Sequence, residues 1–145
     1  MTEVVINAKH GGFGLSPKAS ARYLELVGKN CYIYSLVRDG EFGVKTRYVK
    51  KPVDQVGDRG WYYIYTEDHG DELPDWSTMK HNTLWDDGDI DRTDPVLLRV
   101  VKELGKEADG RFSELKIVVV PDEVDWVIEE YDGWESVHEK HRVWG

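Results

Sequence analysis

The chain has 145 residues, of which 40% are hydrophobic and 32% charged, and its formal net charge is −9. This length suits one domain with its own core, and six Trp and eight Tyr supply large apolar side chains, which excludes disorder of the whole chain. The acidic surplus disfavours binding to nucleic-acid phosphates.

Cysteine content and hydropathy narrow the cellular setting. Cys31 is the single cysteine, which excludes an internal disulfide and gives no support to a thiolate metal cluster. The sequence shows no signal-peptide pattern and no apolar stretch long enough to span a bilayer. We therefore expect a cytoplasmic protein without membrane contact.

The first half of the chain predicts one strand, one helix and three further strands. Residues 3–8 form a short apolar run, and Ser16 is a good N-cap for a helix over residues 17–27. Strands are expected over residues 31–37, 43–49 and 61–66, the last of which is rich in aromatic rings.

A long acidic segment follows. Residues 67–94 carry ten Asp and Glu against two Lys and Arg and show no periodicity. Loops of this length inside a compact domain are uncommon and usually functional or mobile. Trp76 and Trp85 lie within it, so we expect the loop to pack onto the body at these two points.

The second half predicts a helix, a strand and a hairpin. Apolar residues at helical spacing indicate a helix from residue 95 to about Asp109, and residues 115–120 form a continuous apolar strand. Asp132-Gly133 is typical of a two-residue hairpin turn, although a helix over residues 123–131 is an alternative. The expected fold is a single α+β domain over residues 1–145, mostly antiparallel sheet with two helices and a long acidic loop.

The glycine-rich segment before the first helix is a candidate anion site. Backbone N–H groups at a helix N-terminus bind phosphates, and glycines allow a close approach. The segment lacks the spacing of a P-loop or of a dinucleotide fingerprint, and its glycines have an alternative role in simply supplying positive φ. The candidate ligand residues are Lys9, His10, Gly11, Gly12, Gly14, Ser16 and Arg142.

Two segments, one acidic and one rich in histidine, have some features of metal sites. Asp87, Asp89 and Asp91 alternate as at the start of an EF-hand, but Arg92 and Leu98 occupy the positions that need Gly and Glu. His138 and His141 are three residues apart in an expected strand, which places them on opposite faces. We expect no metal and no cofactor.

No catalytic constellation stands out. The chain has no G-x-S-x-G segment, and Cys31 lies in an apolar run where a buried, inert thiol is expected. A small hydrolase that uses a carboxylate with His10 or His138 is one alternative. We therefore assign no catalytic residue and expect binding rather than catalysis.

Segments at both ends of the chain resemble one group of proteins. The N-terminal run Val4-Val5-Ile6-Asn7 with Gly11-Gly12-Phe13-Gly14-Leu15-Ser16 and the C-terminal run Glu129-Glu130-Tyr131-Asp132-Gly133 with Glu139-Lys140-His141-Arg142-Val143-Trp144 carry the likeness. Together they resemble a group of small uncharacterised phage and prophage proteins. Shorter segments between them continue the likeness: Asp94-Pro95, Val101-Lys102-Glu103-Leu104-Gly105, and Leu115-Lys116-Ile117-Val118 with Pro121-Asp122. The resemblance implies a phage-type accessory protein in the bacterial host cytoplasm, implies no reaction, and leaves residues 30–90 unmatched.

Four hypotheses about function follow. The first is a binding protein that counters a host defence, whose acidic surface occupies a host protein that normally binds nucleic acid. The partner-binding residues would be Trp76, Trp85, Asp86, Asp87, Asp89 and Asp91. The alternatives are a protein that binds a small anionic ligand such as a nucleotide signal, the small hydrolase, and a virion or assembly component. A homodimer is possible in each case.

Overall fold

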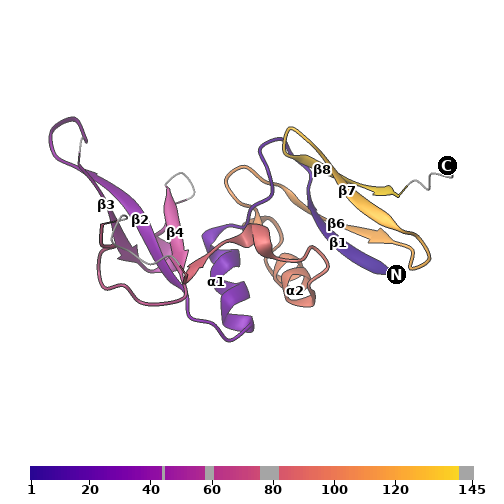
Figure 1. The fold of residues 1–145 in the computed structure, drawn as a ribbon, viewed down its shortest axis with the longest axis horizontal. Helices are drawn as coiled ribbons and strands as arrows, with labels where there is room; N and C mark the ends of the chain where they lie inside the picture. Colours follow the sequence, from indigo (N-terminus) through magenta and orange to yellow (C-terminus); the bar gives the residue numbers. More distant parts are fainter. Residues whose placement is uncertain (44, 58–60, 76–81, 141–145) are drawn as a thin grey trace.

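A computed structural model of the chain describes residues 1–43, 45–57, 61–75 and 82–140. Within these ranges the chain is a single α+β domain with two α-helices, and every described strand pair is antiparallel. Strands gather at both ends of the molecule, and the helices lie between them (Figure 1). The expected fold class is confirmed.

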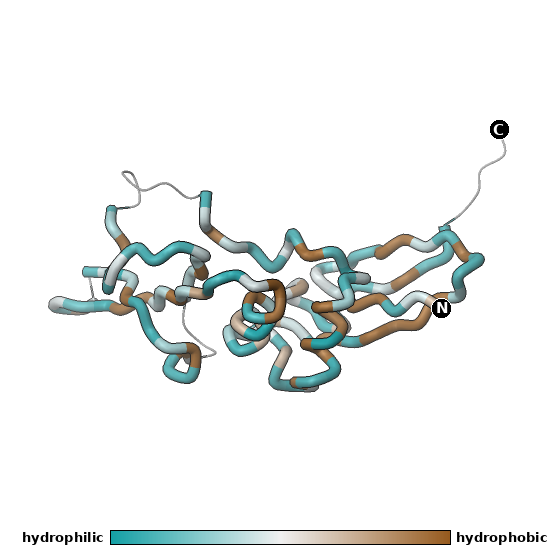
Figure 2. Tube along the Cα trace, turned by 90° about the horizontal axis from the view of Figure 1, so that it is seen from below, coloured by the Kyte–Doolittle hydropathy of each residue, from teal (hydrophilic) through white to brown (hydrophobic). Residues whose placement is uncertain are grey.

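The end of the molecule that carries the N-terminus is built in layers. β1 (Thr2–Asn7) pairs with β6 (Leu115–Val120), and β7 (Trp126–Tyr131) pairs with β8 (Trp134–Glu139). Alternate residues of β1 and β6 face opposite ways, as the pleat of a strand requires. The face with Val4 and Ile6 packs on the β7–β8 hairpin, whereas Val5 faces the helices. Figure 2 shows hydrophobic residues concentrated along these strands.

α1 (Pro17–Leu26) links the two ends of the molecule. Ala19 packs with Leu97 and Val100 of α2 (Pro95–Leu104) in the core beside β1. Leu24 packs instead with Ile33 and Ile64 on the other sheet. That sheet has the order β3–β2–β4–β5, from β3 (Lys45–Lys51), β2 (Tyr32–Asp39), β4 (Tyr62–Tyr65) and β5 (Leu84–Trp85).

Local signals explain most of these boundaries. The Ser16 hydroxyl accepts from the Ala19 amide at 3.1 Å and so caps α1. Asp132 and Gly133 have φ of 49° and 83°, which confirms the two-residue hairpin turn and excludes the helix over residues 123–131.

Some expectations were wrong in detail. The α-helical part of α2 ends at Leu104, because Gly105 takes a φ of 59°, and only a short 3-10 turn (Gly105–Ala108) continues toward Asp109. Residues 67–94 contain β5 and a 3-10 turn (Asp87–Asp89) in addition to loop. In the described part of the chain, neither helix is long and apolar enough to cross a membrane.

Candidate functional site: an acidic aromatic seam

Trp85 lies where the two ends of the molecule meet. Its ring packs against the core around Leu97 and also against the core around Leu24, and it lies 6.1 Å from the ring of Tyr23. Trp85 and Asp86 line two adjoining pockets, which we call the inner pocket and the acidic pocket. The C-terminal part of the long acidic segment is therefore folded. It lies between the sheet that contains β4 and the two helices, and we call this region the seam.

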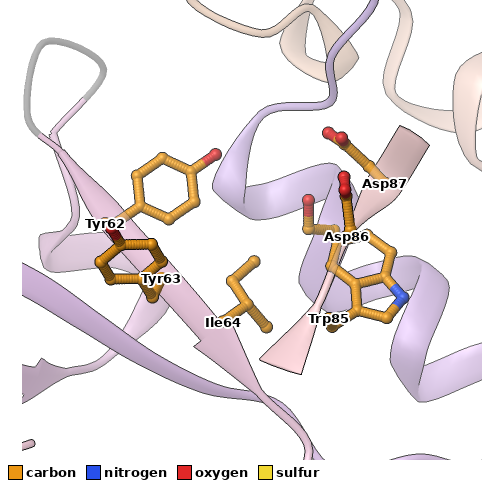
Figure 3. A pocket seen from close by; sticks show the side chains of 7 residues that line it. Tyr62, Tyr63, Ile64, Trp85, Asp86 and Asp87 are labelled. Atoms are coloured by element: carbon orange, nitrogen blue, oxygen red, sulfur yellow. The ribbon is translucent and has the colours of Figure 1, made fainter. Parts of the chain in front are cut away.

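The inner pocket is small and lies between β4 and α1. Its volume is about 190 Å³, and the side chains that line it are shown in Figure 3: Ser20, Tyr62, Tyr63, Ile64, Trp85, Asp86 and Asp87. The Tyr62 hydroxyl is 3.4 Å from the Leu15 carbonyl oxygen, which closes one side. The space suits water or a very small ligand rather than a drug-sized molecule.

The Asp87 side chain is partly buried and points toward Leu15. Its Oδ2 accepts from the Leu15 amide at 2.8 Å. Burial raises the pKa of its carboxyl, and the neighbouring Asp86 carboxylate adds to this rise. This hydrogen bond gives Asp87 a role in holding Leu15 beside the inner pocket.

The acidic pocket is larger and opens on the other side of Trp85. Its volume is about 440 Å³, and Tyr23 and Trp85 supply aromatic surface. Four aspartates line the same pocket: Asp86, Asp89, Asp91 and Asp94. Among the residues that the structure describes, none of these four carboxylates is in an ion pair, although Lys29 also lines the pocket.

Hydrogen bonds hold several of these carboxylates in place. Asp94 caps α2 by accepting from the Val96 amide at 2.8 Å, and its other oxygen accepts from the Tyr23 hydroxyl at 2.6 Å. Burial and this bond raise the pKa of Tyr23 to about 12, so its hydroxyl stays a donor at neutral pH. Bonds from Thr93 lower the pKa of Asp91 and keep it ionised.

This arrangement suits a cation. An aromatic face attracts cations, and fixed carboxylates around it add charge and geometry. A guanidinium group fits better than an ammonium, because it stacks flat on a ring and bonds a carboxylate with two N–H groups. The part of the chain that the structure describes contains no group of three or more His, Cys, Asp or Glu side chains arranged for a metal.

The glycine-rich segment borders the inner pocket at Leu15 and is held by hydrogen bonds within the protein. Amides of Gly11, Leu15 and Ser16 donate to the Asp132 carbonyl, the Asp87 carboxylate and the Ala108 carbonyl. The Ser16 hydroxyl donates to the Glu107 carbonyl at 2.6 Å. The hairpin turn at Gly133 lies against Gly11 and Gly12. These contacts give the glycines a packing role.

The remaining candidate ligand residues do not converge on one pocket. The His10 ring is half-exposed and lies 5.1 Å from the ring of Trp134 on the hairpin. Gly14 accepts through its carbonyl from the Ser113 hydroxyl at 2.6 Å. Lys9 contributes its carbonyl to the Asn7 amide group. Arg142 and Trp76 lie outside the described residues.

His138 has a serine and a carboxylate beside it. The Ser136 hydroxyl is 2.7 Å from its Nε2, and a carboxylate oxygen of Glu129 is 3.5 Å from the same nitrogen. A nucleophilic triad needs the acid on the opposite ring nitrogen from the hydroxyl. The group is therefore not arranged as a triad, and neither His138 nor His10 lines the two seam pockets.

Sequence reasoning missed Tyr23 and Asp94 as members of the site. They are 71 residues apart in the chain, and only the fold brings them together. The sequence Asp94-Pro95 predicts that Asp94 caps a helix, which is a structural role. It does not indicate the contact of Asp94 with Tyr23. Comparison of the chain with family models, with curated proteins and with solved structures found no match.

Proposed function

We propose that this protein acts by binding, as a phage-type accessory protein in the bacterial host cytoplasm. Its acidic pocket takes a cationic side chain, best an arginine, of a host protein whose basic surface otherwise holds nucleic acid. Countering a host defence is the role that fits such sequestration. The single observation that carries the proposal is the pairing of Trp85 and Tyr23 with four carboxylates that have no cationic partner among the described residues.

Charge distribution supports this proposal over direct binding of nucleic acid. Asp86, Asp89 and Asp91 are exposed at the pocket, and phosphates would be repelled from this face. A protein that binds nucleic acid offers the opposite surface, with arginines spaced to meet phosphates. Complementary charge of this kind speeds association and favours the correct partner over others.

The test is affinity capture from infected host lysate with mass spectrometry of what is retained. Neutralising Asp86→Asn, Asp89→Asn and Asp91→Asn together preserves the side-chain acceptors that hold the turns at Gly88 and Thr93. We expect capture of a basic host protein by the wild type and about tenfold or greater loss in this triple variant.

A matched control keeps the change in net charge the same. Glu123→Gln, Asp125→Asn and Glu139→Gln neutralise three exposed carboxylates on the β7–β8 side of the molecule. This second triple variant is expected to capture the host protein as the wild type does. Equal capture by all three proteins would show that the pocket carboxylates are not the binding surface.

A further inference from the structure

The inner pocket contains a buried hydroxyl group that the fold does not use. Ser20 of α1 is 1% exposed and lines this pocket. Its backbone amide donates to the Ser16 carbonyl at 2.9 Å, but no described residue forms a hydrogen bond with its hydroxyl. In the described part of the chain every fully buried polar side-chain atom has a partner, so the small exposed part of Ser20 includes its oxygen. The hydroxyl is therefore open to the pocket.

Two neighbouring carboxylates line the same pocket. Figure 3 shows Asp86 and Asp87 at one side of it. Each uses one oxygen for a backbone amide, since Asp87 Oδ2 accepts from Leu15 at 2.8 Å and Asp86 Oδ1 accepts from Gly88 at 2.9 Å. No described residue donates to the second oxygen of either carboxylate. None of the described side chains that line the pocket is basic, so the pocket offers acceptors without a compensating cation.

These groups define the chemistry that the pocket can accept. Burial raises the pKa of the Asp87 carboxyl, because its negative charge lacks compensation there. A ligand should therefore bring positive charge and N–H donors. The pocket volume of about 190 Å³ is several times the roughly 30 Å³ of one water molecule, and thus more than an ammonium group fills. A guanidinium group is larger, carries five N–H donors in one plane and stacks on aromatic rings such as Trp85.

We propose that the inner pocket binds a guanidinium group, separately from the acidic pocket. Its N–H groups donate to the second carboxylate oxygens of Asp86 and Asp87 and to the Ser20 hydroxyl. Its plane rests on the aromatic surface of Trp85. The guanidinium group comes either from a free guanidino compound or from an arginine of a protein partner. The inference concerns a pocket that the proposed function does not use.

Titration with methylguanidinium, followed through the backbone amide signals in NMR spectra, tests this site. The amides of Ser20, Tyr62 and Ile64 report the inner pocket, and those of Lys29 and Asp91 report the acidic pocket. We expect the inner-pocket signals to saturate with a dissociation constant on the order of 1 mM. Inner-pocket signals that stay unmoved at about ten times this concentration would overturn the proposal. The two pockets are read separately, so the proposed function can fail while this inference holds.

A matched ligand separates hydrogen bonding from charge. Tetramethylammonium carries the same single charge as methylguanidinium but has no N–H donor. It is expected to leave the inner-pocket signals unmoved, because the free carboxylate oxygens and the Ser20 hydroxyl need donors. Equal binding of the two cations at the inner pocket would overturn the assignment of a guanidinium group.

Two peptides distinguish the sources of the guanidinium group. Arginines at positions i and i+2 of an extended segment lie on one face, about 6.6 Å apart, and can enter adjoining pockets. If an Arg-Ser-Arg peptide binds about tenfold more tightly than Arg-Ser-Ser and moves both sets of signals together, the source is a protein partner. If methylguanidinium alone moves the inner-pocket signals, the source is a free compound. Either result supports a guanidinium site.

Two matched variants test the contribution of the carboxylate. Asp87→Asn and Asp89→Asn each remove one negative charge, the first from the inner pocket and the second from the acidic pocket. Asp87→Asn keeps an acceptor for the Leu15 amide. We expect it to raise the dissociation constant of methylguanidinium at the inner pocket by about tenfold, whereas Asp89→Asn leaves this constant unchanged. Equal effects of both substitutions would contradict the proposal.

Ser20→Ala tests the hydroxyl group with two readouts. The hydroxyl has no partner among the described residues and alanine is the better helix former, so the variant is expected to melt no lower than the wild type. Its dissociation constant for methylguanidinium at the inner pocket is expected to rise by about threefold to tenfold. A lower melting temperature with unchanged binding would assign the hydroxyl to the fold and overturn its role in the site.

Discussion

Arg92 and Glu135 form a two-armed ion pair between the end of the acidic segment and the hairpin, with Nη1 2.6 Å from Oε1 and Nη2 2.9 Å from Oε2. Their side chains are 19% and 9% exposed. The backbone N–H of Asn7 donates to the same Glu135 carboxylate. The Arg92 guanidinium lies 3.5 Å from the centre of the Phe13 ring. One ion pair thus ties β1, β8 and the glycine-rich segment together.

Removing one member of this pair is expected to destabilise the protein strongly. Glu135→Ala leaves the Arg92 guanidinium and the Asn7 amide without their partner, at a cost of about 3–5 kcal/mol. Urea unfolding measures this loss. Glu107→Ala, which breaks the exposed ion pair with Lys18, is the control and is expected to cost at most about 1 kcal/mol. Similar losses in both variants would contradict the role given to Glu135.

Gly133 is expected to tolerate no side chain. A Cβ there would lie 2.6 Å from the Gly11 nitrogen and closer still to that of Gly12, at a φ of 83°. Gly28 has a similar φ of 77° but open space around it. Gly28→Ala is expected to cost about 1–2 kcal/mol through backbone strain alone, and Gly133→Ala roughly twice this or more. Thermal melting of both variants measures the two losses of stability. The excess loss in Gly133→Ala is the cost of the steric clash with Gly11 and Gly12.

Asp87 is expected to make the protein less stable as pH rises through the acidic range. Burial raises the pKa of its carboxyl, so above the ordinary aspartate pKa the folded protein binds more protons at this site than the unfolded chain. The free energy of unfolding from this group therefore falls with increasing pH. Asp87→Asn keeps an acceptor for the Leu15 amide and removes the titration.

The comparison between wild type and Asp87→Asn isolates this effect. Asp68 and Asp122 have lowered pKa values and act in the opposite direction, but they are the same in both proteins. Unfolding in urea at several pH values is expected to show a variant that gains stability relative to the wild type as pH rises from about 4 to 7. A difference independent of pH would contradict the burial of the charge.

Local chemistry in the sequence was enough to predict most of the elements. Ser16 before Pro17 defined the start of α1, and Asp132-Gly133 defined the hairpin, because both features depend on neighbouring residues alone. The end of α2 was mispredicted because Ala108 continued the apolar stripe, whereas the backbone of Gly105 adopted a conformation that ends an α-helix.

The site was less accessible to sequence reasoning. Composition was enough to select the acidic segment and Trp85. It could not show that Asp86 is exposed whereas Asp87 points inward. This difference depends on which carboxylate turns inward to the Leu15 amide, 72 residues away in the chain. The pairing of Tyr23 with Asp94 and of Arg92 with Glu135 likewise arises only from the packing of distant segments.

The central proposal is that the acidic pocket binds a cation of a protein partner, and direct titration tests it most closely. Calorimetry with a short arginine-rich peptide, and with the same peptide carrying lysines, measures the preference that a ring face with fixed carboxylates predicts. We expect tighter binding of the arginine peptide and about tenfold weaker binding by the Asp86→Asn, Asp89→Asn, Asp91→Asn variant. Equal affinity of wild type and variant for the arginine peptide would contradict the proposal.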